Sequence, residues 1–239
     1  MVSQTDSRFD TPLYTLAEAA RALDISPSML ATWAKGYVRR RPGKAAVTGL
    51  PILTTVAEPS HRGPIIPFVG LAEGMVLAAV RSAGLPMQRV RPALDVLARD
   101  IGIDHALASR RLATDGAELL FDYADHADSD EAGPLHELVV VRSGQRMFTE
   151  TVRQYLQRID YGDDGYARLI RLPSYDIADV VADPTRAFGQ PIFARGGSRV
   201  ADALGRFWAG EDLQTVSEEF GVPIGQLEDV VRVASRRAA

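Results

Sequence analysis

Two helix start signals follow each other closely near the N-terminus, and they constrain the fold more than any other feature of the sequence. Thr15 is a typical helix N-cap residue, and Glu18 stands three positions later, which is the pattern of a capping box. Ser26 is a second N-cap residue, and Pro27 suits the first helical position because its φ is fixed and it lacks an N–H. The sequence therefore predicts two short helices joined by a tight turn at residues 24–25, which is a helix-turn-helix.

The second of these helices has one apolar face and one polar face. Met29, Leu30 and Trp33 are expected to point inward, and Gly36 ends the helix. In helix-turn-helix units the outward side chains of the second helix contact base edges and phosphates. The outward residues predicted here are Ser28, Ala31, Thr32 and Lys35.

A basic segment follows the second helix and is expected to form a small hairpin, or wing, over residues 37–52. The side chains expected to contact DNA phosphates there are Arg39, Arg40, Arg41 and Lys44. The alternative interpretation is a helical hairpin that carries a solvated run of charge. The basic wing beside the two helices favours DNA binding.

Charge is unevenly distributed along the chain. The net charge of −4 argues against a protein that coats nucleic acid over its whole surface. Residues 21–44 contain six basic residues and one acid, whereas residues 112–135 contain seven acids and neither Lys nor Arg. Any contact with DNA is therefore expected at the N-terminal end.

The remaining patterns predict a mainly α protein with small β elements. Helices are expected over residues 71–83, 86–101, 147–159, 200–209, 212–220 and 223–236, and strands over 119–123, 138–141, 166–172, 180–181 and 191–194. Residues 1–12 show no apolar periodicity and are expected to fray. The last two helices, with the turn at residues 220–223 between them, repeat the bihelical shape.

These elements divide the chain into four expected parts. They are a winged helix-turn-helix over 1–58, a dimerisation or connecting helical pair over 59–115, a central α+β partner-binding region over 116–175, and a small bihelical domain over 176–239. The helices over 71–83 and 86–101 are the expected dimer surface.

Enzyme chemistry finds little support in the sequence. There are no cysteines, and the four histidines lack the spacing of metal ligands. We therefore expect no catalytic residues, no metal and no cofactor. No apolar run is long enough to cross a bilayer, so we expect a soluble, cytoplasmic protein without membrane contact.

The N-terminal motifs resemble the MerR-like DNA-binding domains. The resemblance rests on Tyr14-Thr-Leu-Ala-Glu-Ala-Ala, on Ser26-Pro-Ser-Met-Leu-Ala-Thr-Trp33, and on a following helix pair containing Ala83-Gly-Leu-Pro-Met-Gln-Arg-Val-Arg. It implies a winged helix-turn-helix. Because the chain has no cysteine, a metal-sensing role like that of many such regulators is not expected.

The C-terminal part resembles a small domain found in many bacterial antitoxins. The matching segments are Asp183-Pro-Thr-Arg-Ala-Phe-Gly189-Gln-Pro191-Ile-Phe-Ala, Gly196-Gly-Ser-Arg-Val200 and Trp208-Ala-Gly-Glu-Asp-Leu213. The whole layout is similar to the antitoxin of a VapBC-type toxin–antitoxin pair. This resemblance implies a PIN-domain-like ribonuclease as partner, autorepression of the shared operon through operator DNA, and a homodimer.

Arginines are candidates for contact with such a toxin, since PIN-like nucleases hold acidic residues around divalent metal. The candidate toxin-binding residues are Arg195, Arg199, Arg236 and Arg237. The acidic middle of the chain is an alternative surface, for a basic face of the toxin.

Two rival functions remain open at this point. The chain is alternatively a ligand-responsive, MerR-like transcription regulator without a toxin partner, with a small-molecule pocket over residues 115–175. It is alternatively a nuclease or mobile-element protein that binds metal through acids such as Asp122 and Asp125.

Overall fold

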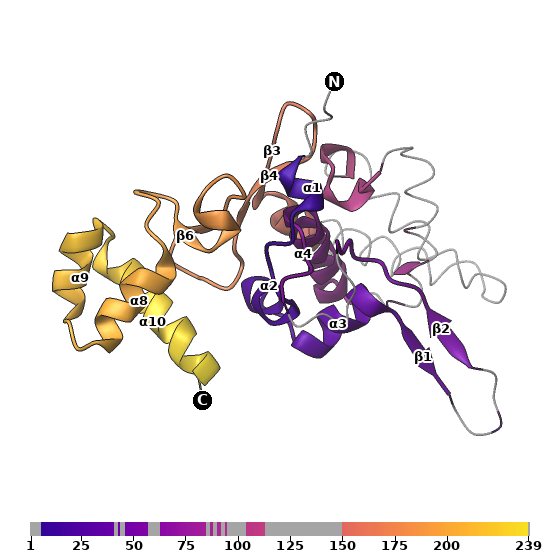
Figure 1. The fold of residues 1–239 in the computed structure, drawn as a ribbon, viewed down its shortest axis with the longest axis horizontal. Coiled ribbons are helices and arrows are strands. Elements are labelled where there is room, and N and C mark those ends of the chain that lie inside the picture. The colour runs from indigo at the N-terminus through magenta and orange to yellow at the C-terminus, as the bar shows by residue number, and fades with distance from the viewer. Residues whose placement is uncertain are drawn as a thin grey trace, which may run out of the picture.

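The computed structural model describes residues 6–40, 43, 46–56, 63–84, 87, 90, 91, 94, 104–112 and 150–238. Figure 1 shows an N-terminal helical unit with a projecting hairpin, a C-terminal group of three helices, and a small sheet between them. The fold is mainly helical with small antiparallel sheets, as the sequence predicts. Among the described residues, no helix combines the length and apolar character needed to cross a membrane.

Both predicted helix starts are confirmed. Helix α2 (Leu16–Ala22) follows Thr15, whose side chain accepts a hydrogen bond from the N–H of Glu18, while the Glu18 carboxylate accepts from the N–H of Thr15 at 2.8 Å. Helix α3 (Pro27–Lys35) follows Ser26, whose hydroxyl accepts from the N–H of Met29 at 3.2 Å. Strands β1 (Tyr37–Arg39) and β2 (Val47–Gly49) then pair antiparallel and form the wing (Figure 1).

Helix α4 (Phe68–Ser82) is enclosed by the rest of its own chain. Thirteen of its fifteen residues are buried. A Cβ at Gly74 would lie 2.7 Å from Leu23 Cδ1, so the C-cap residue of α2 packs closely on α4 at this glycine. The core of the helix-turn-helix therefore continues into α4, across the domain boundary expected at residue 58.

The burial of α4 corrects one prediction. The sequence suggested an amphipathic helix over residues 71–83 with a face free for a second copy of the chain. That interpretation is wrong, because α4 has no apolar face left to offer and a helix that is apolar all round is a core helix. Of the companion helix predicted over 86–101, only residues 87, 90, 91 and 94 are described, and all four are helical.

The N-terminal segment also differs from its prediction. Residues 7–10 form a short helix, α1 (Ser7–Asp10), where fraying was expected. Arg8 forms ion pairs with Asp6 and Asp164, and the Phe9 ring contacts His105 and Tyr166 with ring centroids 5.2 and 5.1 Å apart. Apart from Asp6, these partners lie far away in the sequence, so local periodicity could not indicate them.

A four-stranded antiparallel sheet connects the two ends of the molecule. Its order is β3 (Ile159–Tyr161), β4 (Ala167–Arg171), β5 (Val180–Ala182) and β6 (Ile192–Phe193). Residues 150–156 before it are helical, so the helix predicted over 147–159 stops short and Ile159 begins β3 instead. The strands predicted at 119–123 and 138–141, and the acidic stretch, lie outside the described residues.

The C-terminal unit contains the three predicted helices. After a 3₁₀ turn, η3 (Ala187–Gly189), they are α8 (Val200–Trp208), α9 (Leu213–Phe220) and α10 (Ile224–Ala238). Asp229 of α10 is fully buried, and its carboxylate accepts hydrogen bonds from the N–H groups of Ile177 and Ala178 at 2.7 and 2.9 Å. This pair of contacts fixes α10 to the segment that leads into β5.

Hydrogen bonds from the C-terminal half reach the end of α2. Ser174 Oγ donates to the carbonyls of Arg21 and Ala22 at 2.8 and 3.0 Å, and Arg237 donates to the Arg21 carbonyl at 2.8 Å. The Tyr14 hydroxyl donates to the Gly189 carbonyl at 2.8 Å. In Figure 1 the C-terminal end of α10 accordingly runs toward α2.

A buried carboxylate lies within the core beside α4. Glu73 is 5 % exposed and accepts hydrogen bonds from the N–H of Thr54 at 2.7 Å and from its hydroxyl at 3.0 Å. The Nδ1 atom of His105, just before the 3₁₀ turn η1 (Ala106–Ala108), lies 3.1 Å from the same carboxylate. The Glu73 side chain thus joins the end of the wing segment to η1.

We expect this contact to make stability depend on pH. The hydrogen bond to Glu73 raises the pKa of His105, so the folded protein holds the proton more tightly than the unfolded chain. The stabilisation is therefore complete below the unfolded pKa of about 6.5 and is lost as the pH rises through the folded value. Urea unfolding should show that His105→Asn costs about 1 kcal/mol more at pH near 5.5 than at pH near 8.5.

The Glu73→Gln background is the control for this prediction. Without the carboxylate, the cost of His105→Asn should differ much less between the two pH values, since only the weaker effects of Asp104 and Asp10 on the pKa of His105 remain. An undiminished pH dependence in that background would assign the effect to a group other than Glu73.

Candidate nucleic-acid interface

The turn between α2 and α3 sets the direction of the second helix. Asp24 adopts a left-handed backbone with φ of 54°, and the N–H of Ile25 donates to the Ala20 carbonyl at 3.0 Å. Leu30 and Trp33 of α3 are buried against α2 and α4, with 0 % and 2 % exposure. The opposite face of α3 is therefore turned away from the core.

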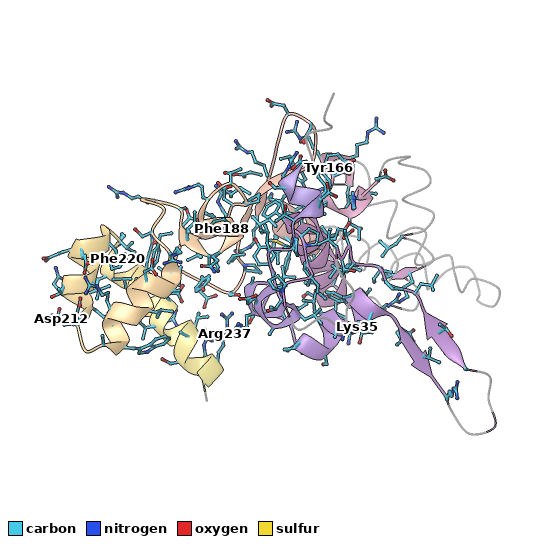
Figure 2. All side chains as sticks on the ribbon, in the orientation of Figure 1. Lys35, Tyr166, Phe188, Asp212, Phe220 and Arg237 are labelled. Carbon is cyan, nitrogen blue, oxygen red and sulfur yellow. The ribbon has the colours of Figure 1, made fainter. Side chains whose placement is uncertain are left out.

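The predicted contact residues of α3 lie on this outer face. Ser28 is exposed, and its hydroxyl lies 3.1 Å from that of Ser26. Thr32 is half-buried and donates its hydroxyl hydrogen to the Ser28 carbonyl at 2.8 Å, so it meets a partner through its lone pairs or its methyl group. Lys35 is exposed at the end of α3, where the helix meets the wing (Figure 2).

The wing begins at a glycine that no other residue can replace without strain. Gly36 has a φ of +71°, and a Cβ there would lie 2.3 Å from the Gly49 carbonyl oxygen. Beyond this point β1 and β2 project away from the body (Figure 1). Their apolar side chains face solvent: Val38 is 60 % exposed and Val47 is 50 % exposed. A hairpin with this projection can lie along a DNA groove beside α3.

The structure describes only part of the predicted basic wing. Arg40 is exposed at the end of β1. The backbone of Arg39 is in β1, where it pairs with Val47, and Arg41 and Lys44 lie outside the described residues.

An arginine outside the predicted set holds the base of the wing. Arg91 donates to the Leu50 carbonyl, and its guanidinium lies 5.3 Å from the centre of the Tyr37 ring. A cation over an aromatic ring stabilises a partly exposed contact by about 1 kcal/mol. Sequence reasoning missed this residue because its partners are fixed by the tertiary fold and carry no local signal.

The four predicted toxin-binding arginines come from two places. Arg195 is exposed in the glycine-rich turn before α8 (residues 195–198), and Arg199 makes a two-point ion pair with Asp202 at 2.8 and 2.9 Å. Arg236 and Arg237 are exposed in the last turn of α10, where Arg237 contacts α2.

An exposed aromatic residue near the glycine-rich turn was not predicted. Phe188 is 85 % exposed, and both it and Ala187 have positive φ angles, of 54° and 48°. The neighbouring Arg186 packs on Gly197, where a Cβ would lie 1.9 Å from its guanidinium nitrogen. The turn η3 and the glycine-rich turn are therefore in direct contact.

No metal centre stands out in the part of the chain that the structure describes. No group of three or more His, Asp or Glu side chains there is arranged to hold a metal ion. Asp164, in the acidic turn after β3, is paired with Arg8, which lowers the pKa of its carboxyl.

The chain is similar to known proteins in both sequence and structure. Residues 12–94 match a family described as "Putative DNA-binding HTH domain". Over 232 residues the chain is 49 % identical to "Putative antitoxin VapB45" of Mycobacterium tuberculosis H37Rv, covering 95 % of this chain and 96 % of that protein. The crystal structure of Rv2018 from Mycobacterium tuberculosis matches with a TM-score of 0.74 and 43 % identity, covering 94 % of this chain and 99 % of that one.

We expect Gly36→Ala to destabilise the protein by about 1–3 kcal/mol for two reasons. Alanine is strained at the positive φ of this position, and its methyl group would clash with the Gly49 carbonyl oxygen. Gly43→Ala is the matched control: Gly43 has a φ of +73°, but a Cβ there meets no atom within 4 Å. Urea unfolding should give a clearly smaller loss for Gly43→Ala. Equal losses for the two variants would mean that the close approach to Gly49 is not what requires glycine.

Proposed function

Because this chain belongs to the VapB45 antitoxin family, we propose that it has two binding activities. Through α3 and the wing it binds the operator of its own operon and represses transcription. Through its C-terminal unit it binds and neutralises a PIN-domain-like ribonuclease toxin. The observation that carries the DNA-binding half is the outer face of α3, which lies beside a projecting hairpin.

The major groove of B-DNA is wide enough to admit one α-helix. With α3 in the groove, Ser28 and Thr32 lie on the face that meets base edges, and Lys35 lies where the helix leaves the groove. The wing then follows the phosphate backbone with its basic residues. Those residues are Arg39, Arg40, Arg41 and Lys44.

We propose a homodimer as the operator-binding form. A two-fold symmetric dimer places two copies of α3 on half-sites about one helical turn apart, so the operator is expected to be an inverted repeat. The dimer contact has to lie outside α4, because the chain itself buries that helix.

We propose that the toxin contacts the surface formed by η3 and the glycine-rich turn. Phe188 presents an exposed ring, and both it and Ala187 have positive φ angles. A residue in this conformation lowers the stability of the fold by about 1–3 kcal/mol, and such strain is retained mostly at functional sites. Arg195 lies on the adjoining glycine-rich turn, and Arg199 is the N-cap residue of α8. An aromatic residue beside arginines is the composition typical of binding hot spots, and it suits an acidic nuclease surface.

The DNA-binding proposal predicts a specific salt dependence. Lys35→Ala and Arg40→Ala should each reduce the slope of log affinity against log salt by about 1, since each removes one phosphate contact. Ser28→Ala should instead alter the preference between operator and random DNA. Fluorescence anisotropy with the DNA upstream of the operon, titrated at several salt concentrations, measures both effects.

Arg206→Ala serves as the control for DNA binding, because Arg206 lies in the C-terminal unit and pairs there with Glu211 and Glu219. It should leave the salt slope unchanged. If all three arginine or lysine variants change the slope equally, binding depends on net charge and not on α3 and the wing.

The toxin-binding proposal predicts a separation of the two activities. Phe188→Ala, and Arg195→Ala combined with Arg199→Ala, should each weaken toxin binding about 30-fold while operator affinity stays unchanged. The measurements are co-purification from cells that co-express the neighbouring toxin gene, and rescue of growth. Leu50→Ala, which changes an exposed apolar residue (76 %) beside the wing, should rescue growth as well as the unaltered chain. Full rescue by the Phe188 and arginine variants would place the toxin contact elsewhere.

A further inference from the structure

A cavity of about 540 Å³ lies between the helix-turn-helix and the C-terminal unit. One wall comes from α2 and the residues before it, and the other comes from α8, the end of α10 and the segments beside β4 and β5. Cavities that hold small ligands measure about 300–1,000 Å³ and often form where two units meet. The size and position of this cavity are those of a ligand site.

Part of the wall is apolar and ends in an exposed aromatic ring. Leu172 is buried, Leu204 is half-buried, and Trp208 is 60 % exposed although it lines the cavity. An exposed indole is a large apolar surface that gains free energy when a ligand covers it. This side of the cavity suits the hydrocarbon part of a ligand.

Each wall of the cavity contributes one arginine, Arg21 from α2 and Arg237 from α10. Arg21 and Arg237 both line it, and in the part of the chain that the structure describes neither guanidinium forms an ion pair with a carboxylate. Arg237 uses one nitrogen to donate to the backbone carbonyl of Arg21 at 2.8 Å. Guanidinium groups have five N–H donors in a planar fork that matches a carboxylate.

Two further polar groups shape the charge of this wall. Tyr175 is buried, and burial raises the pKa of its phenol, which stays protonated at neutral pH and forms a hydrogen bond with Arg237. Glu18 is the acid in the lining, but its Oε2 atom already accepts from the N–H and the hydroxyl of Thr15, at 2.8 and 2.7 Å. The excess charge that faces a ligand is therefore positive.

We propose that this cavity is a binding site for an amphiphilic carboxylate. The carboxylate group lies between the guanidinium groups of Arg21 and Arg237, and the hydrocarbon part lies against Leu204 and Trp208. Such a ligand contacts the first helix of the DNA-binding unit and the C-terminal unit at once. The site depends neither on the toxin nor on the operator, so it can be tested on the purified chain alone.

The two tryptophans of the chain make a direct test possible. Trp33 is 2 % exposed in the helix-turn-helix core, whereas Trp208 stands at the cavity, so ligand binding should change the fluorescence of Trp208 alone. Titration with octanoate should give a saturable change in the full chain and none in Trp208→Phe. Octylamine, which has the same tail with a positive charge, and acetate, which lacks the tail, should give no saturable change.

Arginine variants test where the carboxylate binds. By calorimetry, Arg21→Gln and Arg237→Gln should each weaken octanoate binding about tenfold, the effect of one lost charge-assisted hydrogen bond. Arg236→Gln is the matched control, because Arg236 is the exposed neighbour of Arg237 and does not line the cavity. Circular dichroism verifies that each variant is folded.

Three results would overturn the proposal. They are the absence of any saturable change with octanoate, equal binding of octanoate and octylamine, and equal affinity of the Arg21→Gln, Arg237→Gln and Arg236→Gln variants.

Discussion

The enclosure of α4 is the constraint on which the rest of the structure depends. Nearly all of α4 is buried, and α1, η1 and β4 pack on it together with the helix-turn-helix. Gly74 lets α2 come close, and the Glu73 carboxylate receives its hydrogen bonds from Thr54 and His105. Helix α3, which we propose binds DNA, is thereby supported on its inner face by a packed core, while its outer face stays accessible to DNA.

The end of α2 couples this core to the C-terminal unit. The last carbonyls of a helix have no partners within it, and they need donors from elsewhere. For Arg21 and Ala22 the donors include Ser174 and Arg237, more than a hundred residues away in the sequence. The helix-turn-helix is therefore oriented by the C-terminal half of the chain. The cavity described above lies at this junction, where a bound molecule contacts both halves.

Local signals predicted the local structure well. Thr15, Ser26 and Pro27 act within one helical turn, so the starts of α2 and α3 could be read from the sequence, and so could the three C-terminal helices. The full burial of α4 could not, because its apolar residues fit both an amphipathic helix and a core helix. The cation–aromatic contact of Arg91 with Tyr37 and the ion pair of Arg8 with Asp164 join distant segments, so they carry no local pattern. The cavity was missed for the same reason: its walls come from both ends of the chain.

The strained turn at Phe188 is close to this junction. Two successive left-handed residues and an exposed ring reduce stability, so folding alone does not account for them. The turn is held by the hydrogen bond from Tyr14 to Gly189, and the backbone of Tyr14 pairs with Ile66 immediately before α4. The proposed toxin-binding surface at η3 is thus connected through Tyr14 to the core that supports α3. Gly189, the neighbour of Phe188, is thus one hydrogen bond away from Tyr14, which directly precedes the N-cap residue of α2.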